Sequence, residues 1–376
     1  MNPATLNETQ TTSPVPANPK EFTHQIEIRP LGHLYGSAGP FLSPENLVGR
    51  AGAHFPPSAM TFAGLVAAIV ADEKAIKPYQ FAGPFWAWQN NLDNIYIPTP
   101  FNCLVKDNQI QHQMAWRDGK WQAWDQKTQQ WQTPQDDKYQ AGTWLSLETW
   151  QQLNPSDPKK LTVEAGPWQF TPYLHPKLQL EQRKTVEENG LFLENAVALN
   201  PDACLVYLCN HAVEPGWYRF GGEGHMVELS CRELGAPLKA LLGEKCDRTF
   251  ATITPAVWGS NRRSLRSPRI DQKGKPAWPE GEDHNFDQTI EITALLTGKP
   301  LPLRHRIGKP THKQDPSHFP NLLSRGRYAM PAGTVYVLDE QLGKPWHDWP
   351  LSWFPTEGYS YKCFGCGLAL PLKAEG

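Results

Sequence analysis

The chain has 376 residues, with 36 Lys and Arg against 38 Asp and Glu and a net charge of −2 at pH 7. This length suits two ordinary domains or one elaborated domain, and the balanced charge excludes a global basic field, so nucleic acid would need a local patch. The 36 prolines, 29 glycines and 15 tryptophans favour short strands and long loops over a helical bundle. No apolar run is long enough to span a membrane, so no membrane partner is expected.

Residues 1–20 are polar and rich in Pro, Thr and Asn, and they predict a disordered tail without a secretory signal. The seven scattered cysteines are typical of reduced thiols in a cytoplasmic protein. Cys363 and Cys366 have C-x-x-C spacing, but no second pair accompanies them, so we interpret them as small residues beside a terminal strand. We expect no metal and no cofactor.

The first confident elements are a strand and a helix. Residues 24–29 alternate polar and apolar side chains and end at Pro30, which predicts a half-buried strand. After a loop-like stretch, residues 59–72 place Phe62, Leu65 and Val66 on one face, with Ser58 as the N-cap. The order of strand, loop and helix is typical of the opening of a ferredoxin-like β-α-β unit.

Residues 81–88 and 94–100 predict two further strands, and a different composition follows them. Between about 103 and 180 the chain is rich in Trp, Gln and Asp, which predicts a small β-hairpin insertion, with a short helix over 144–153. The tryptophans suit a glycan-binding platform, although packing within a small inserted subdomain is the favoured interpretation.

A second half begins near residue 182 and again favours strands. The predicted extended segments are 190–199, 204–210, 226–231, 249–257, 300–307, 330–338 and 365–371, with a polar loop over 258–288.

The most informative stretch is residues 218–225, which contains three glycines in four positions. Glycine removes the Cβ atoms that keep a backbone away from a ligand and permits positive φ. Arg219 and His225 flank the glycines and offer phosphate pairing, while Phe220 offers base stacking. This combination suits single-stranded RNA or DNA, although a plain glycine-rich hairpin turn is the alternative.

Two further groups of arginines are candidate phosphate contacts. The loop-like segment 262–269 carries four arginines, whose planar guanidinium groups bind phosphate bidentately. Elsewhere arginines recur at spacing two, which places both members of a pair on one face of a strand. A solvated loop and an ion-paired sheet face are equally good explanations. The residues are Arg262, Arg263, Arg266 and Arg269, then Arg304, Arg306, Arg325 and Arg327.

No arrangement of residues demands catalysis. The chain lacks a His-Glu-x-x-His motif, a Gly-x-Ser-x-Gly elbow and a phosphate-binding P-loop. A metal-independent ribonuclease can work with scattered histidines, and the candidates to screen are His33, His54 and His225. His33 and Tyr35 also suit base stacking.

Several blocks in order resemble one family, the RAMP superfamily of CRISPR-associated proteins, specifically the third subunit of the type III-B Cmr effector complex, related to the Cas-five group. Residues 28–31 are similar to the family's Arg-Pro-Leu start, 55–64 to the segment before its first helix, and 219–225 to its Leu-Gly-Gly-Glu-Gly-Arg loop. Further blocks are 83–85, 96–100, 331–336 and 365–369. Three departures are His225, where arginine is common, Gly32-His33 in place of a more usual start that contains an acidic residue, and the tryptophan-rich insertion.

The resemblance implies an α+β fold of tandem ferredoxin-like (RRM-like) modules with β-hairpin and loop insertions. After the tail at 1–20, the modules would span 21–180, including the insertion at about 103–180, and 181–376 with the glycine-rich loop. It implies a non-catalytic subunit that binds the 5′ handle of a crRNA and contacts the large polymerase-like subunit and the backbone RAMP subunits in antiviral defence.

With the features above, the resemblance gives a set of expected RNA-binding residues: Arg29, His33, Ser58, Arg219, Phe220, Gly221, Gly222, Gly224, His225, Arg262, Arg263, Arg266, Arg325 and Arg327. Two alternatives stay open. One is a Cas-six-like repeat endoribonuclease with His33 or His54 as the catalytic histidine, and the other is a tryptophan-rich carbohydrate-binding protein.

Overall fold

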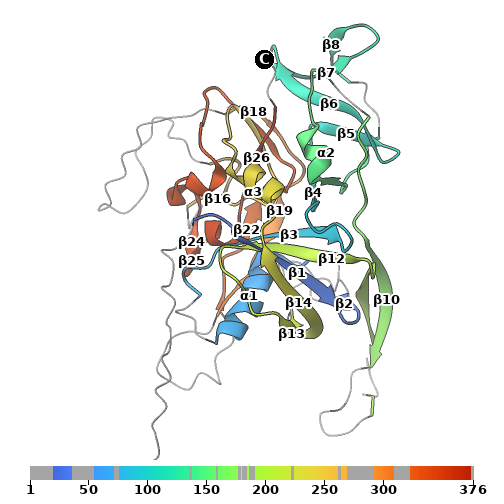
Figure 1. Cartoon of the computed structure of the whole chain (residues 1–376), viewed down its shortest axis with the longest axis vertical. Helices are drawn as coiled ribbons and strands as arrows, with labels where there is room; N and C mark the ends of the chain where they lie inside the picture. The colour runs from blue at the N-terminus through green and yellow to red at the C-terminus, as the bar shows by residue number, and fades with distance from the viewer. Residues whose placement is uncertain are drawn as a thin grey trace, which may run out of the picture.

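The computed structural model describes residues 20–35, 55–71, 76–134, 138–157, 160–176, 179, 184–185, 191–221, 224–260, 264–268, 292–308 and 322–373. The described chain is built mostly from antiparallel strands with few helices (Figure 1). Five residues singled out in the sequence lie outside the described ranges, together with the expected tail: His54, Gly222, Arg262, Arg263 and Arg269.

The largest sheet has seven strands in the order β13-β14-β1-β12-β3-β4-β9. Strand β1 runs antiparallel to both of its neighbours, β14 and β12. The strands are β1 His24–Pro30, β3 Phe81–Trp88, β4 Tyr96–Pro98, β9 Trp144–Ser146, β12 Ala203–Cys209, β13 Gly216–Phe220 and β14 His225–Glu233. The strands predicted over 24–29, 81–88, 94–100, 204–210 and 226–231 are confirmed.

Helix α1, Ala59–Val70, covers one face of this sheet as its apolar stripe predicts. Phe62 stacks on Tyr207 of β12 at 4.6 Å between ring centroids and contacts Phe81 of β3 edge-on at 5.5 Å. Ser58 occupies the N-cap position, but its hydroxyl does not cap the helix. Its backbone carbonyl accepts the first helical bonds instead, from the N–H groups of Thr61 and Phe62.

A second sheet has the order β18-β23-β15-β26, again with all neighbours antiparallel. Its strands are β15 Thr249–Thr252, β18 Ile292–Leu296, β23 Val335–Leu338 and β26 Ala369–Pro371. Numbered along the chain, these strands lie in the order 2-3-1-4. The segment β14-β1-β12-β3 of the first sheet has the same order read from the opposite edge. The two sheets therefore share one strand arrangement.

The first sheet takes strands from both sides of residue 180, because β12, β13 and β14 all follow that position. The division into modules at residues 180 and 181 stays a prediction, as does the tandem ferredoxin-like arrangement. Helix α3, Ala236–Gly243, precedes β15 and was not predicted. Pro237 in its first turn and Leu238 and Leu241 on its buried face are the signals that indicate it.

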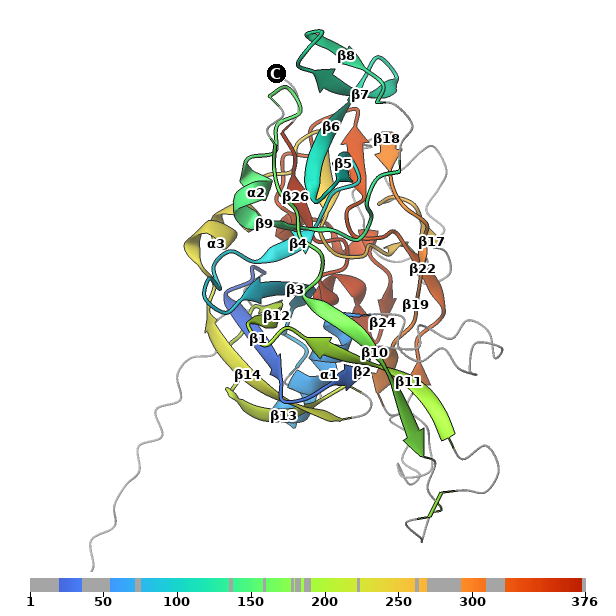
Figure 2. The same ribbon diagram turned by 90° about the vertical axis from the view of Figure 1, so that its right-hand side faces the viewer.

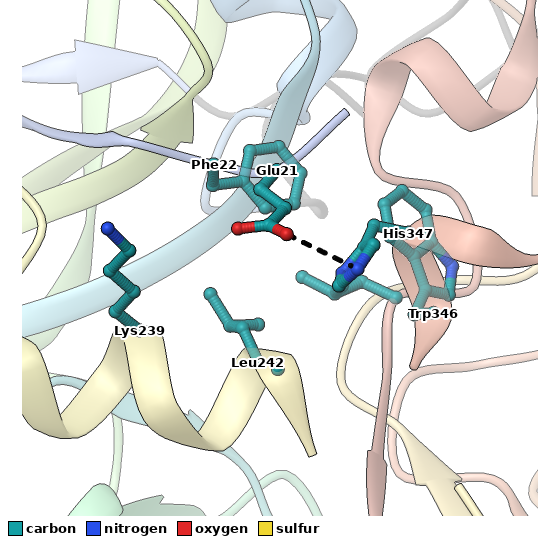
Figure 3. Close-up of a pocket in the computed structure, with 8 residues that line it drawn as sticks. Glu21, Phe22, Lys239, Leu242, Trp346 and His347 are labelled. Atoms are coloured by element: carbon teal, nitrogen blue, oxygen red, sulfur yellow. Dashed lines mark ion pairs between the residues drawn. The ribbon is translucent and has the colours of Figure 1, made fainter. Parts of the chain in front are cut away.

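One hydrophobic core lies between the two sheets. It joins Phe85 of β3 and Val206 of β12 to Phe250 and Tyr336 of the second sheet. Because α1 covers the other face of β12, all seven residues of that strand are buried. Phe22, just before β1, stacks on Trp346 at 5.9 Å and extends this packing to the C-terminal segment (Figure 3).

The tryptophan-rich segment forms a separate four-stranded sheet at the top of Figure 1, as predicted. Within it the tryptophans pair with each other, Trp116 with Trp121 at 5.5 Å and Trp124 with Trp131 at 5.6 Å. Its strands are β5 Cys103–Lys106, β6 Gln109–Arg117, β7 Lys120–Asp125 and β8 Gln130–Gln132.

The helix predicted over 144–153 is shorter, α2 Leu147–Gln151. The three residues before it form β9, which pairs with β4, because this pairing buries all three of their side chains. Ser146 then caps the helix by accepting a hydrogen bond from the N–H of Thr149 at 3.2 Å.

A long hairpin of β10, Trp168–Pro176, and β11, Leu191–Leu199, projects from the body beside β2, Leu34–Tyr35 (Figure 2). The remaining short elements are β16 Trp258–Gly259, β17 Ser264–Leu265, β19 Leu301–Leu303, β20 Arg306–Gly308, β21 Leu322–Leu323, β22 Arg327–Ala329, β24 Thr356–Glu357, β25 Tyr359–Ser360, η3 Trp346–Asp348, η4 Leu351–Trp353 and η5 Tyr361–Phe364.

Candidate nucleic-acid interface

The glycine-rich turn joins β13 to β14 at the edge of the first sheet. Gly221 has φ +77° and Gly224 has φ +66°, and the N–H of Gly224 donates to the carbonyl of Gly221 at 3.2 Å. A side chain is strained at such φ values, so the backbone conformation explains both glycines. A Cβ placed on Gly221 would have no atom within 4 Å, so the space above this exposed residue is open.

An aromatic pair lies beside the turn. His225, the first residue of β14, contacts Tyr35 of β2 with ring centroids 4.7 Å apart and planes tilted by 32°. Its buried Nε2 has no hydrogen-bond partner among the described residues. His33 is exposed two residues before Tyr35. Because β2 pairs with β11, the turn and this aromatic pair lie near the start of the long hairpin.

Two arginines near the turn have different environments. Arg219 is exposed on β13, one residue from the buried Phe220. Arg29 is half-buried on β1, and its guanidinium lies 3.5 Å from Glu228 and 3.6 Å from Glu27. Burial raises the pKa of Glu27, and the charge of Arg29 acts against that shift. Arg29 therefore already has two carboxylate neighbours, whereas Arg219 is open to solvent.

Phe220 does not fit the expected role in base stacking. Its side chain is buried in the core beneath α1, with its ring 6.3 Å from that of Tyr207. Strand alternation turns Tyr218 and Phe220 toward this core and leaves Trp217 and Arg219 exposed on the opposite face. Trp217 was not among the predicted site residues, although this alternation already places it on the same face as Arg219.

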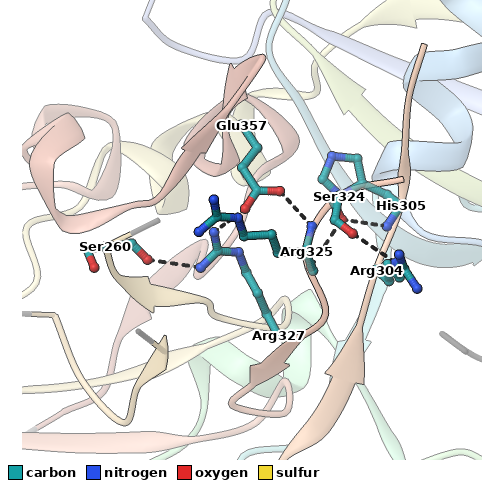
Figure 4. Close-up of polar contacts among 7 residues, drawn as sticks. All are labelled: Ser260, Arg304, His305, Ser324, Arg325, Arg327 and Glu357. Carbon is teal, nitrogen blue, oxygen red and sulfur yellow. Dashed lines mark hydrogen bonds and ion pairs between the residues drawn. The ribbon is translucent and has the colours of Figure 1, made fainter. Parts of the chain in front are cut away.

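Arg327 is the clearest correction. Its side chain is only 3% exposed and forms an ion pair with Glu357 (Figure 4). The guanidinium also donates to the carbonyl of Ser260 at 2.9 Å and lies over the Tyr361 ring at 5.4 Å. An arginine enclosed in this way is not open to a ligand, and it connects β22 to β24 and to the residue that follows β16.

Residues near Arg327 also make internal contacts, although Arg304 and Arg325 are exposed (Figure 4). The backbone N–H of Arg325 donates to Glu357 at 2.9 Å, and the Arg304 Nε donates to the Ser324 carbonyl at 2.9 Å. Arg325 is exposed while Arg327 is buried, so the spacing of two does not place both on an open face. Desolvation in this cluster lowers the pKa of His305 to about 4.

The other predicted residues lie elsewhere. Arg266 is exposed, and its carbonyl accepts a hydrogen bond from the Tyr336 hydroxyl at 3.0 Å in the second sheet. Ser58 lies at the start of α1. The structure thus places Arg219 and Arg29 on the face of the first sheet opposite α1, and His225 on the α1 face beside Tyr35, with Gly221 and Gly224 in the turn between Arg219 and His225. His33 lies two residues before Tyr35. Gly222, Arg262 and Arg263 stay untested because they lie outside the described residues.

Other kinds of site find little support in the described part of the chain. A hollow of about 20 Å³ between Glu21, Lys239 and His347 has room for about one water (Figure 3). Within the described ranges, no group of three or more metal-binding side chains comes together. No helix among the described residues is long and apolar enough to cross a membrane. All seven cysteines are free thiols.

Comparison with known proteins decides the family. Residues 26–373 match the model of the family described as CRISPR-associated protein (Cas_Cmr3). The chain belongs to the Cas_Cmr3 family. From residue 26 on, this match covers the strands of both sheets, the tryptophan-rich insertion and the glycine-rich turn.

The Cas_Cmr3 family member is also similar to solved structures. Two are cryo-EM structures of a type III-B Cmr-beta bound to cognate target RNA, the second also with AMPPnP, with TM-scores of 0.44 and 0.42. Each is 10% identical and covers 83% of this chain and 86% of its own. A Csm1-Csm4 cassette in complex with pppApA is 9% identical with a TM-score of 0.32, over 85% and 88% of the two chains. No curated protein matches the sequence significantly.

Proposed function

We propose that this Cas_Cmr3 family member is a non-catalytic, crRNA-binding subunit of a type III effector complex. In this function it binds the repeat-derived 5′ handle and contacts the large polymerase-like subunit and the backbone RAMP subunits in antiviral defence. The observation that carries the proposal is the turn at Gly221, which is open above its backbone and lies between the exposed Arg219 and the His225–Tyr35 ring pair.

Each part of this turn has a function toward a single RNA strand. The bare backbone at Gly221 allows a phosphate to approach the main chain closely. Arg219 supplies a positive charge with bidentate hydrogen-bond geometry. The His225–Tyr35 ring pair lies beside the turn, where it can contact an unpaired base of the same RNA strand. Near the turn, the described cations are Arg219 and Arg29, and Arg29 already has two carboxylate neighbours. We therefore expect part of the affinity to come from neighbouring subunits.

The shared strand order of the two sheets supports the finer fold assignment. A β-α-β-β-α-β unit of the ferredoxin type has four antiparallel strands in the order 4-1-3-2. Both sheets contain that order, and α1 follows the first strand of the first sheet as the unit requires. We therefore infer two ferredoxin-like modules, the first of which is completed by strands after residue 180.

A matched pair of variants tests the proposed contact. Gly221→Asp and Gly221→Asn add side chains of nearly equal size, both of residue types that occur at positive φ, and they differ chiefly in charge. If a phosphate lies at Gly221, the Asp variant retains much less guide RNA than the Asn variant when the complex is purified with its genomic neighbours. The difference shrinks as salt rises, because charge repulsion is screened.

Equal RNA retention by the two variants, with equal thermal unfolding, would exclude a phosphate contact at this turn. Sequencing the retained RNA tests the second part of the proposal, since a handle-binding subunit protects repeat-derived 5′ ends. Specific cleavage of repeat RNA by the purified chain, lost in His33→Ala or His54→Ala, would favour the endoribonuclease instead. Salt-insensitive binding to a polysaccharide would favour the carbohydrate-binding alternative.

A further inference from the structure

Six side chains form two rows on the face of the first sheet opposite α1. The strand register places Trp217, Glu228 and Arg29 side by side in one row, on β13, β14 and β1. In the next row Arg219 lies opposite Met226, and the N–H of Leu31 donates to the Met226 carbonyl at 3.0 Å, just beyond the end of β1. We call these six residues the open-face patch.

The patch is exposed at the end of the sheet that carries the glycine-rich turn. Trp217 is 69% exposed, Leu31 51% and Met226 41%, large values for apolar side chains. Farther along the same face, Gln25 donates to the carbonyl of Leu92 at 2.9 Å and Arg232 pairs with Asp93 at 2.6 Å. The segment with Leu92 and Asp93 therefore covers that end, and the patch stays open beside the turn.

The mixture of side chains in the patch selects the kind of ligand. Apolar groups alternate with charges: Glu228 lies between Trp217 and Arg29, and the guanidinium of Arg29 is 3.5 Å from its carboxylate. An apolar protein surface docked here would desolvate these charges without replacing their partners, which is costly. A nucleotide has a flat apolar face, polar base edges and an anionic phosphate, and each matches one kind of group in the patch.

We propose that Trp217 stacks on one unpaired base of the RNA strand whose backbone passes Gly221, with Arg219 contacting a phosphate between them. This inference rests on the proposed function and adds a base-binding position to it. Trp217 precedes Gly221 by four residues, about 13 Å along an extended strand. The stacked base and the phosphate at the turn therefore belong to different nucleotides of one strand.

Affinity measurements at several salt concentrations separate stacking from phosphate contact. The intact complex, or the full chain with its neighbouring subunits, is titrated with a single-stranded RNA copied from the repeat of its own locus. Trp217→Ala should weaken binding roughly tenfold, because it removes the aromatic ring on which the base stacks, and it should leave the salt slope unchanged. Trp217→Phe should retain most of the affinity, whereas Arg219→Ala should make the salt slope shallower by about 1.

Two controls make the test specific. Tyr328 on β22 is 57% exposed, and Tyr328→Ala should bind RNA like the wild type. RNAs with a single abasic nucleotide, moved along the repeat sequence, locate the stacked base. At one position the abasic RNA should bind weakly to the wild type and show no further loss with Trp217→Ala, because the two changes remove the same contact.

The possible failures are distinguishable. If Trp217→Ala binds RNA like the wild type while Gly221→Asp still weakens binding, the stacking inference is wrong and the proposed function stands. If neither variant changes RNA binding, both are wrong. If Trp217→Ala keeps its RNA affinity but loses a protein subunit on purification, the patch contacts protein, and the inference is again overturned.

Discussion

Arg219 and Arg327 show how differently one residue type is used in two regions of this molecule. Both were expected to contact RNA. Arg219 is exposed on an edge strand beside an open turn, whereas Arg327 is 3% exposed and is bound by Glu357, the Ser260 carbonyl and the Tyr361 ring. The difference lies in what the neighbouring strands supply. Arg327 pairs with the Glu357 carboxylate and is therefore buried with it. Arg219 is exposed, so its charge is available to a ligand.

Removing each guanidinium should give the largest contrast between these regions. Arg327→Ala removes the ion-pair partner of the mostly buried Glu357, which keeps the backbone N–H of Arg325, and a hydrogen-bond donor to the Ser260 carbonyl. We expect a loss of about 3–5 kcal/mol in the free energy of unfolding. Arg219→Ala should change it by less than about 0.5 kcal/mol, because the side chain is exposed. Urea unfolding of both variants measures this. Equal stabilities would contradict the contrast between the two regions.

Acid should act on the region of Arg327 through His305. Burial lowers the pKa of His305 from 6.5 to about 4, so in the folded chain the ring stays neutral while the unfolded chain takes up a proton. The contribution of the neutral His305 ring to the free energy of unfolding is fully present above pH 6.5 and is lost as the pH falls toward 4. The loss amounts to about 3 kcal/mol.

His305→Phe keeps a ring against Tyr361 and Phe364 and removes the titrating group. Its free energy of unfolding should therefore fall less than that of the wild type over the same pH range. If both proteins lose stability in parallel on acidification, His305 is not the group responsible.

A smaller effect on stability than those at Arg327 and His305 is expected in the glycine-rich turn itself. Gly221→Ala forces a Cβ into positive φ and should cost about 1 kcal/mol, with no steric clash to add to it. Gly243→Ala is the control, because this residue ends helix α3 without positive φ and its Cβ would also meet open space. It should be neutral or slightly stabilising. A loss of several kcal/mol in Gly221→Ala would show that the turn is part of the core.

Local patterns were enough to predict the elements with strong periodicity. Ile26 and Ile28 alternate with polar residues and lie in a strand, and Phe62, Leu65 and Val66 recur at helical spacing and lie in α1. Residues 144–146 were included in the helix predicted over 144–153, and pairing with β4 makes them a strand instead. The glycine-rich turn and the tryptophan-rich insertion were predicted from composition alone.

The choice of site residues needed information that no single segment contains. Strand alternation indicates that Trp217 and Arg219 share a face, but only the pairing of β13, β14 and β1 shows that Leu31 and Arg29 extend that face. In the same way, the spacing of Arg325 and Arg327 gives no sign of Glu357, which approaches from thirty residues farther along the chain.

The amino-acid sequence by itself determined the family, the strand-rich architecture and the position of the glycine-rich turn, because these depend on periodicity, composition and short motifs. The tertiary structure decided which charged and aromatic side chains are open to a ligand. Exposure is set by long-range strand pairing and by packing between the two sheets, and these bring together residues whose contacts leave no trace in local sequence.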